Sequence, residues 1–382
     1  MEAYLDNAAT TQALEEVCQV MDQVMREDYG NPSSLHKKGL EAEHYIKHAR
    51  EVIAATLKVE PKEIYFTSGG TESNNWALHG IAMAKKRQGK HIITSSVEHA
   101  SVLNPLGFLE ELGYEITYLP VDEYGKVKIS ALKEAIRPDT IMVSVMGVNN
   151  EVGAVQPLRE IADVIKASGQ NIIFHVDAIQ MYGKLELYPK RLGIDLLSVS
   201  GHKIHGPKGS GFLYIKDRTN IKPFIFGGNQ QSGMRSGTEN VPAIAGLAVA
   251  AEYIYQRNFK EDHIAYMQKI KAHFIEEVTK LPDCYDHSGE APHIASITFR
   301  GIRSEVLLHA LEERGVYVSS GSACSSNKPE LSGTLLNMGL TPADAESTLR
   351  FSFSTFTKEE ELDYAVEQLK ELLPALRRFV RR

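Results

Sequence analysis

The sequence predicts an α/β protein in which a large unit contains a mostly parallel sheet and a smaller second unit is of the α+β type. Between residues 64 and 215, short apolar runs typical of strands alternate with amphipathic stretches typical of helices. Strands that alternate with helices form parallel sheets covered by helices on both faces. From residue 258 onward this alternation stops, and helices and strands are mixed. The length of 382 residues is sufficient for two units with sizeable cores.

The first elements in the chain are an extended segment at residues 4–11 and two amphipathic helices. Apolar residues recur at helical spacing from Val17 to Met25, and Cys18 within this helix is interpreted as part of the core. The second helix is predicted at residues 37–57. The strands of the large sheet are predicted at residues 64–67, 91–94, 115–119, 140–146, 172–176, 195–199 and 211–215. The helices that accompany them are predicted from about residue 72 and at residues 101–112, 129–136, 158–167 and 243–257.

The second unit is predicted to contain three strands and three helices. The strands are expected at residues 295–299, 316–319 and 348–354. The helices are expected up to residue 280, at residues 304–314 and at the C-terminal end. A glycine- and serine-rich loop at residues 320–326 interrupts this pattern and contains Cys324.

The composition is that of an ordinary globular protein, with 43% hydrophobic and 24% charged residues. A net charge of -7 argues against a general nucleic-acid binder. We find no secretory signal and no apolar stretch long enough to span a bilayer, so we expect a cytoplasmic protein that does not contact membranes. The three cysteines are far apart in the sequence, which is unlike a disulfide framework or a zinc site. We therefore expect no bound metal.

The segment Ser200-Gly201-His202-Lys203 directly follows an apolar strand. A lysine that is partly removed from water is easily made neutral and nucleophilic, as a Schiff base to an aldehyde cofactor requires. The hydroxyl, the close-approach glycine and the imidazole before it suit a phosphate held beside the lysine. The segment alone indicates a lysine that binds pyridoxal 5'-phosphate (PLP), although a lone lysine on a loop is usually a surface residue.

Polar residues follow the other predicted strands at the same edge of the sheet. In parallel sheets, ligands bind outside the carboxyl ends of the strands. Asp177 could cap a helix, but beside a lysine it could keep the pyridine nitrogen of PLP protonated. Gln180 could reach the phenolic oxygen of the ring. The Gly69-Gly70-Thr71 turn, where a strand meets a helix, offers backbone N–H groups and a hydroxyl to a phosphate.

Three further side chains could take part in chemistry. His99 could be structural, or it could stack on the ring and move protons. Arg350 alternates with apolar residues along a strand, and it could point outward or bind a substrate carboxylate with two hydrogen bonds. Cys324 lies among small polar residues, so we expect its thiol on a mobile loop that could reach a substrate.

Taken together, these segments resemble the PLP-dependent cysteine desulfurases of the NifS/IscS type, within the class V aminotransferase-like enzymes. The resemblance runs from about residue 4 to residue 356, nearly the whole chain. The segments that carry it, in the order expected of the family, are YLDNAATT, GNPSSLH, FTSGGTESNN, EHASVL, VNNEVGAVQP, HVDAIQ, SGHKIHGPKG, MRSGTEN, SSGSACSS and LRFSFS.

The resemblance implies PLP-dependent transferase fold type I. A large PLP-binding domain with a seven-stranded sheet would cover residues 13–257. A small domain formed by residues 1–12 and 258–382 would carry the catalytic cysteine loop. It also implies a homodimer. The residues that would bind the cofactor are Gly70, Thr71, His99, Asn150, Asp177, Gln180, Ser200, Gly201, His202, Lys203 and Thr238.

Within that set the resemblance implies separate roles. Thr238 would reach the phosphate in the partner subunit, and Asn150 and Gln180 would contact the region of the phenolic oxygen. Arg350 and Asn150 would bind the substrate, L-cysteine. The implied catalytic residues are Lys203, Cys324 and His99.

The implied reaction removes sulfur from L-cysteine, leaving L-alanine and a persulfide on Cys324. The persulfide would pass to an acceptor protein, either an iron–sulfur cluster scaffold or a tRNA-thiolating enzyme, with no direct contact to nucleic acid. Two alternatives stay open, a selenocysteine lyase and a non-catalytic PLP-binding scaffold for sulfur relay. The first would use the same lysine chemistry, whereas the second would have no need of Lys203 or Asp177. A plain aminotransferase would have no use for Cys324.

Overall fold

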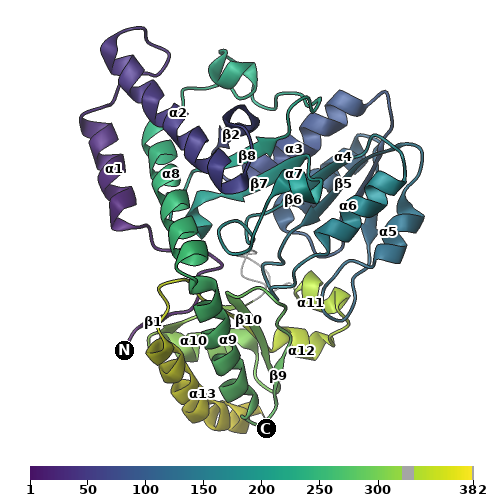
Figure 1. Cartoon of the computed structure of the whole chain (residues 1–382). Coiled ribbons are helices and arrows are strands. Elements are labelled where there is room, and N and C mark those ends of the chain that lie inside the picture. The colour runs from purple at the N-terminus through teal and green to yellow at the C-terminus, as the bar shows by residue number, and fades with distance from the viewer. Residues whose placement is uncertain (321–330, 381–382) are drawn as a thin grey trace.

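The computed structural model describes residues 1–320 and 331–380 of the chain. Its largest element is a seven-stranded sheet, which Figure 1 shows above a smaller body formed by the C-terminal part of the chain. The strands, in spatial order, are β2 (Ile64–Thr67), β8 (Gly211–Ile215), β7 (Leu196–Ser200), β6 (Ile173–Asp177), β5 (Thr140–Met146), β3 (His91–Ser95) and β4 (Glu115–Leu119). Strand β8 runs antiparallel to β2 and β7, and all other neighbouring strands of this sheet are parallel. The predicted mostly parallel sheet is confirmed.

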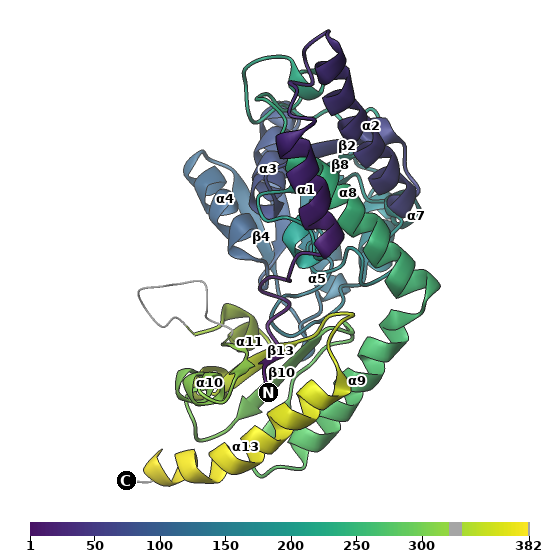
Figure 2. The same cartoon turned by 90° about the vertical axis from the view of Figure 1, so that its left-hand side faces the viewer.

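Successive residues of the central strands enter two different cores, because side chains alternate between the faces of a sheet. Ile92 packs in one core and Ile93 in the other, and Met142 and Val143 divide in the same way. The helices of the first core are α3 (Gly70–Lys85) and α4 (Ala100–Glu111). The helices of the second core are α1 (Glu15–Arg26), α2 (Lys37–Leu57), α5 (Ile129–Ala135), α6 (Leu158–Ala167) and α8 (Val241–Tyr255). Figure 2 shows α4 and α3 on the left of the upper body and α1, α8 and α2 to their right.

The second unit has its own four-stranded antiparallel sheet and its own core. Its strands, in spatial order, are β12 (Ser319–Ser320), β13 (Thr348–Ser352), β10 (Ile294–Phe299) and β9 (Cys284–Asp286). Phe274 packs on Phe351 with ring centroids 4.8 Å apart, and helices enclose this aromatic centre. These helices are α9 (His263–Thr279), α10 (Ser304–Glu312) and α13 (Glu359–Val380).

The start of the chain packs against the second unit. Strand β1 (Ala3–Tyr4) pairs in parallel with β11 (Val316–Tyr317), and Ala3 and Leu5 are buried in the second core. Residues 6–11 then cross to the large sheet, where Thr11 donates its backbone N–H to the carbonyl of His202. We propose that the predicted division, residues 13–257 against residues 1–12 and 258–382, follows most of these two cores, although Ala291, Leu335, Met338 and Ala345 pack in the core of the large unit.

Several short elements were not predicted from the sequence. The helices and turns among them are η1 (Pro61–Glu63), α7 (Pro189–Leu192), η2 (Gly201–Lys203), η3 (Gln230–Gly233), η4 (Gln256–Lys260), α11 (Gly333–Asn337) and α12 (Pro342–Glu346). The strands among them are β1 and β9. The predicted strand at residues 316–319 is divided, because Val316 pairs with the N-terminal segment whereas Ser319 pairs with β13.

One sequence-based expectation is wrong, since Cys18 is exposed and not part of the core. It follows the buried Val17 on α1, about 100° further around the helix, which turns its side chain away from the packed face. Across residues 1–320 and 331–380, no helix is both long and apolar enough to cross a bilayer. The same residues contain no group of three or more His, Cys, Asp or Glu side chains arranged to hold a metal ion.

Candidate active site

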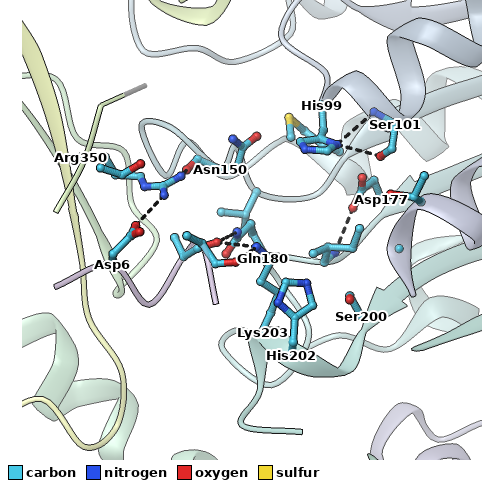
Figure 3. A pocket seen from close by; sticks show the side chains of 18 of the residues that line it. Asp6, His99, Ser101, Asn150, Asp177, Gln180, Ser200, His202, Lys203 and Arg350 are labelled. Atoms are coloured by element: carbon cyan, nitrogen blue, oxygen red, sulfur yellow. Dashed lines mark hydrogen bonds and ion pairs between the residues drawn. The ribbon is translucent and has the colours of Figure 1, made fainter. Parts of the chain in front are cut away.

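A cavity of about 480 Å³ lies at the carboxyl ends of the parallel strands, where the two units and residues 6–9 meet (Figure 3). Most residues predicted from the sequence lie in its wall. These residues are Gly70, Thr71, His99, Asn150, Asp177, Gln180, Ser200, His202, Lys203 and Arg350.

Lys203 occupies the last position of the tight turn η2, directly after strand β7. The turn requires glycine at position 201, since a Cβ atom there would lie 2.4 Å from the Ser210 Oγ. The Lys203 Nζ donates to the backbone carbonyls of Ala8 (2.7 Å) and Ala9 (2.6 Å). Lys184 donates from its Nζ to the Lys203 carbonyl (2.9 Å), so the lysine is fixed at both its backbone and its tip.

One end of the cavity combines features of an anion site. Helix α3 begins at Gly70, and its first turn directs backbone N–H groups and the Thr71 hydroxyl toward the cavity. A side chain at position 70 would bring its Cβ to 2.1 Å from the Ile179 Cδ1. Ser200 and His202 line the same cavity from the neighbouring turn. A phosphate could accept hydrogen bonds from all of these groups.

Asp177 ends strand β6 and is 4% exposed. Its carboxylate accepts hydrogen bonds from the Asn74 Nδ2 (2.7 Å) and from the Ile179 backbone N–H (3.0 Å). Burial raises the pKa of Asp177, although these two hydrogen bonds oppose that shift. A cationic N–H group in the cavity would therefore favour the ionised form of Asp177 and be held by it.

His99 is the N-cap residue of α4, and its Nδ1 accepts from the Ser101 backbone N–H (3.0 Å). A backbone N–H can only donate, so the proton of a neutral His99 ring is on Nε2. Burial lowers the pKa of His99 and keeps the ring neutral. The Ser101 hydroxyl lies 2.8 Å from the same Nδ1 and accepts from Asn74 (2.9 Å). Asn74 thus links His99, through Ser101, to Asp177.

Arg350 reaches the cavity from strand β13 of the second unit, and its side chain is 9% exposed. It donates to the Asp6 carboxylate (2.9 Å) and to the backbone carbonyl of Asn150 (2.8 Å), as Figure 3 shows. Its Nε is buried and has no hydrogen-bond partner in the described part of the chain. A buried guanidinium with donor capacity beside a cavity is suited to a carboxylate.

Three predicted site residues are not in the cavity wall. Gly201 is buried directly behind it. Thr238 is exposed on the segment between η3 and α8. Cys324 lies outside the described residues.

Three residues of this network were not predicted: Asn74, Ser101 and Asp6. Asn74 is four residues after Gly70, so both residues lie on the same face of α3. That spacing could have indicated that Asn74 faces the cavity. Ser101 directly follows the His99-Ala100 pair at a helix start, a position typical of local hydrogen bonding. Nothing in the sequence pairs Asp6 with Arg350.

Comparison with known proteins identifies the family. The sequence profile described as aminotransferase class-V matches residues 3–365. A protein named cysteine desulfurase IscS from Dictyoglomus turgidum is 44% identical over 98% of this chain and 95% of its own length. The chain belongs to the class-V aminotransferase family. Another protein named cysteine desulfurase IscS, from Methanosarcina thermophila, is 43% identical over 98% of this chain and 92% of its own length.

Solved structures of this family have the same fold. A NifS-like protein superposes with a TM-score of 0.93 at 36% identity, and the match covers 98% of this chain and 100% of that one. A structure described as SspA in complex with cysteine gives a TM-score of 0.83 at 36% identity, over 93% of this chain and 100% of that one. The fold is PLP-dependent transferase fold type I, as the sequence predicted.

The cofactor of this family is PLP, and the residues of the cavity fit it. The start of α3 with Ser200 and His202 suits the phosphate, and Lys203 lies at the cavity wall with its amine inside. The buried Asp177 carboxylate lines the same cavity, where it could hold the protonated ring nitrogen of PLP. Because Gly70 has no Cβ, the Ile179 side chain has room to line the cavity, where it could pack against a flat ring.

Proposed function

We propose that this protein is a cysteine desulfurase, which converts L-cysteine to L-alanine and transfers the sulfur atom to Cys324. The observation that carries the proposal is the cavity itself, in which a lysine and a buried carboxylate from the large unit face an arginine from the second unit. The relatives of nearly full length that carry the name cysteine desulfurase support the same reaction.

PLP, when bound, supplies an aldehyde that links to amines and a ring that withdraws electrons from the neighbouring carbon. We assign Lys203 to holding it through the amine, and Gly70, Thr71, Ser200, Gly201 and His202 to binding its phosphate. Asp177 holds the ring nitrogen in its protonated form. Asn150 and Gln180 would contact the phenolic oxygen, and His99 would stack on the ring.

The substrate is held and activated by the same residues. Arg350 binds the carboxylate of L-cysteine with charge-assisted hydrogen bonds, and Asn150, next to Arg350 in the cavity wall, supports it. This orients the substrate so that its α-proton faces Lys203, whose amine removes that proton and later returns one. His99 carries its proton on Nε2 and can donate it to the departing product.

Cys324 performs the sulfur transfer. Its thiolate attacks the sulfur of the substrate, so that a sulfur–sulfur bond forms and the carbon–sulfur bond breaks. The electron pair of the broken bond stays with the carbon, which takes up a proton to give L-alanine. The products balance the reactants, because L-cysteine and a thiol become L-alanine and a persulfide.

Three finer points belong to the same proposal. The persulfide passes to an acceptor protein, which is an iron–sulfur cluster scaffold or a tRNA-thiolating enzyme. The protein is a cytoplasmic homodimer. Thr238, exposed on its own subunit, reaches the phosphate bound by the partner subunit.

The decisive experiment compares two variants during incubation with L-cysteine. We expect Lys203→Ala to lose the visible absorbance of lysine-linked PLP and to lose alanine formation by at least about 100-fold, the lower range for proton transfer by a positioned group. We expect Cys324→Ala to keep the absorbance but to release no sulfide. In the unmodified protein, mass spectrometry should find one additional sulfur atom on the Cys324 peptide.

Cys18→Ala serves as the matched control, because Cys18 is an exposed cysteine on α1 and should be dispensable. Full sulfide release by the Cys324→Ala protein would contradict the assignment of the sulfur transfer. The alternatives from the sequence are not favoured. The relatives are named for cysteine desulfuration, and a scaffold without catalysis would have no need of the Lys203 and Asp177 side chains in one cavity.

A further inference from the structure

His293 is a buried histidine of the second unit whose side chain forms a hydrogen bond with a residue of the large unit. It directly precedes strand β10, it is 0% exposed, and its carbonyl accepts from the Phe353 backbone N–H (2.9 Å). Its Nε2 lies 3.2 Å from the Oε1 of Gln180, a residue of the cavity wall. No local sequence pattern connects these two residues, which are 113 positions apart.

The orientation of the Gln180 amide follows from its other partner. The Gln180 Nε2 donates to the Ala8 carbonyl (2.9 Å), and a carbonyl oxygen can only accept. The Gln180 Oε1 therefore faces His293, and the imidazole must donate from Nε2. The Ala8 carbonyl also accepts from Lys203, so His293, Gln180, Ala8 and Lys203 form one continuous chain of hydrogen bonds.

The ring of His293 can supply only that one donor. Burial, with the nearby charges of Lys184 and Lys271, holds the pKa of His293 well below its usual value, so the imidazole is neutral. A neutral imidazole has a single N–H. With that N–H on Nε2, Nδ1 is a buried acceptor that has no hydrogen-bond partner in the described part of the chain. An unpaired Nδ1 costs free energy. The fold therefore keeps the hydrogen bond from the His293 Nε2 to Gln180 at the expense of a partner for Nδ1.

We propose that His293 is a positioning residue for the cofactor, which it affects by fixing the Gln180 amide with its N–H₂ group toward Ala8 and the interior of the cavity. This inference rests on the role proposed above for Gln180 beside the phenolic oxygen of PLP. Without the donor on His293, only the Ala8 carbonyl would hold the Gln180 amide in this orientation. A rotated amide would present its oxygen to the phenolic oxygen of PLP, and these two oxygen atoms would repel each other.

The test uses three substitutions that differ in where a donor remains. The glutamine Nε2 is three bonds from Cβ, as is the histidine Nε2, whereas the asparagine Nδ2 is in the place of Nδ1. We expect His293→Leu and His293→Asn to weaken PLP binding by the apoprotein about fivefold, the effect of one neutral hydrogen bond. Both should also shift the absorbance maximum of bound PLP. We expect His293→Gln to retain both properties.

The second part of the test is a double-mutant cycle with Gln180→Ala. If His293 acts through Gln180, His293→Leu has no further effect on PLP affinity or on the absorbance maximum once Gln180 is alanine. A second effect of about fivefold in that background would overturn the assignment, as would an equal loss in His293→Gln and His293→Leu. His273→Ala is the control. His273 is a half-buried histidine that pairs with Asp363 in the same unit, and its replacement should leave PLP binding unchanged.

These measurements are independent of the overall reaction. Because they record cofactor affinity and absorbance, they succeed or fail whether or not L-cysteine is desulfurated. Failure of the unmodified protein to form alanine would reject the proposed function alone. Loss of the coupling between His293 and Gln180 would reject only the role of His293.

Discussion

The two sides of the cavity are built in different ways. On the large-unit side, Lys203, Asp177 and His99 follow the ends of parallel strands, and Asn74 and Ser101 connect two of them by hydrogen bonds. On the side of the second unit, one strand presents Arg350, which is held by a carboxylate and a carbonyl. With the roles proposed above, the residues for the cofactor lie on the large unit, and the arginine for the substrate carboxylate lies on the second unit. Substitutions on the two sides should therefore have separable effects.

The largest difference is expected for Arg350→Lys. A lysine keeps the charge but loses the planar fork that binds a carboxylate with two hydrogen bonds. We expect KM for L-cysteine to rise about 10- to 100-fold, since a charged hydrogen bond contributes about 1.5–3 kcal/mol. The absorbance of bound PLP should not change. Steady-state alanine formation and absorbance spectra measure both quantities.

Arg300→Lys is the matched control for this variant. Arg300 pairs with Asp344 on the surface of the same unit, far from the cavity wall, and its replacement should leave KM unchanged. If Arg350→Lys lost bound PLP while KM stayed constant, the separation between the two sides would be wrong.

A smaller effect of the opposite kind is expected for Asn74→Ala. Removal of this amide takes one hydrogen bond from the buried Asp177 carboxylate, which raises the pKa of Asp177 further. We expect PLP to bind about 5- to 10-fold more weakly, with KM for L-cysteine changed less, because one hydrogen bond to a carboxylate is lost. Titration of the apoprotein with PLP measures the affinity. Asn75→Ala, the next residue on α3, should have no such effect, and equal losses in both variants would point to damage of the helix.

The smallest effects are expected on the pH dependence of stability. They have opposite signs for Glu98 in the large unit and His293 in the second unit. Burial raises the pKa of Glu98 to about 8 and lowers that of His293, so both groups are neutral in the folded protein near pH 7. In the unfolded chain, a glutamate ionises as pH rises above its ordinary pKa of 4.5. The contribution of Glu98 to the free energy of unfolding should therefore be largest at low pH and should decrease as pH rises toward 8. The slope is up to about 1.4 kcal/mol per pH unit.

His293 should behave in the reverse sense. In the unfolded chain, a histidine takes up a proton as pH falls below its ordinary pKa of 6.5, whereas the folded His293 does not. The contribution of His293 to the free energy of unfolding is therefore lost as pH falls through 6.5. Thermal unfolding from pH 5 to pH 8.5 should show that Glu98→Gln flattens the alkaline side of the profile and His293→Gln the acid side. Parallel profiles for the unmodified protein and Glu98→Gln would show that Glu98 is already ionised when folded.

The parts of the site that could be predicted from the sequence are those tied to strand ends. Asp177 and Lys203 each directly follow an apolar run, and a parallel sheet brings such positions to one edge whatever the details of packing. Arg350 was also predicted, because it alternates with apolar residues along a predicted strand. In each case the local pattern limits where the side chain can be.

The residues that were missed depend on contacts between distant segments. Asn74 meets Asp177 across 103 positions and Asp6 meets Arg350 across 344. An amide on a helix or a carboxylate in a polar loop has no pattern of its own, and its role is set by packing that only the folded chain creates. Cys18 shows the same limit for a residue whose position was predicted. Its helix was predicted correctly, but the sequence did not reveal that Cys18 lies on the exposed face of that helix.

The placement of residues 6–8 has a consequence for the order of biosynthesis. Asp6 pairs with Arg350, Ala8 donates its backbone N–H to the Ser352 hydroxyl (2.8 Å), and the Ala8 carbonyl accepts from Lys203. The first two of these contacts join segments that lie 344 positions apart in the sequence. A ribosome-bound chain can therefore form most of the large sheet, yet it cannot complete the cavity until residue 352 has emerged. The nascent protein would stay inactive until that point, and a purification tag fused close to Asp6 would disturb catalysis before it disturbed the sheet.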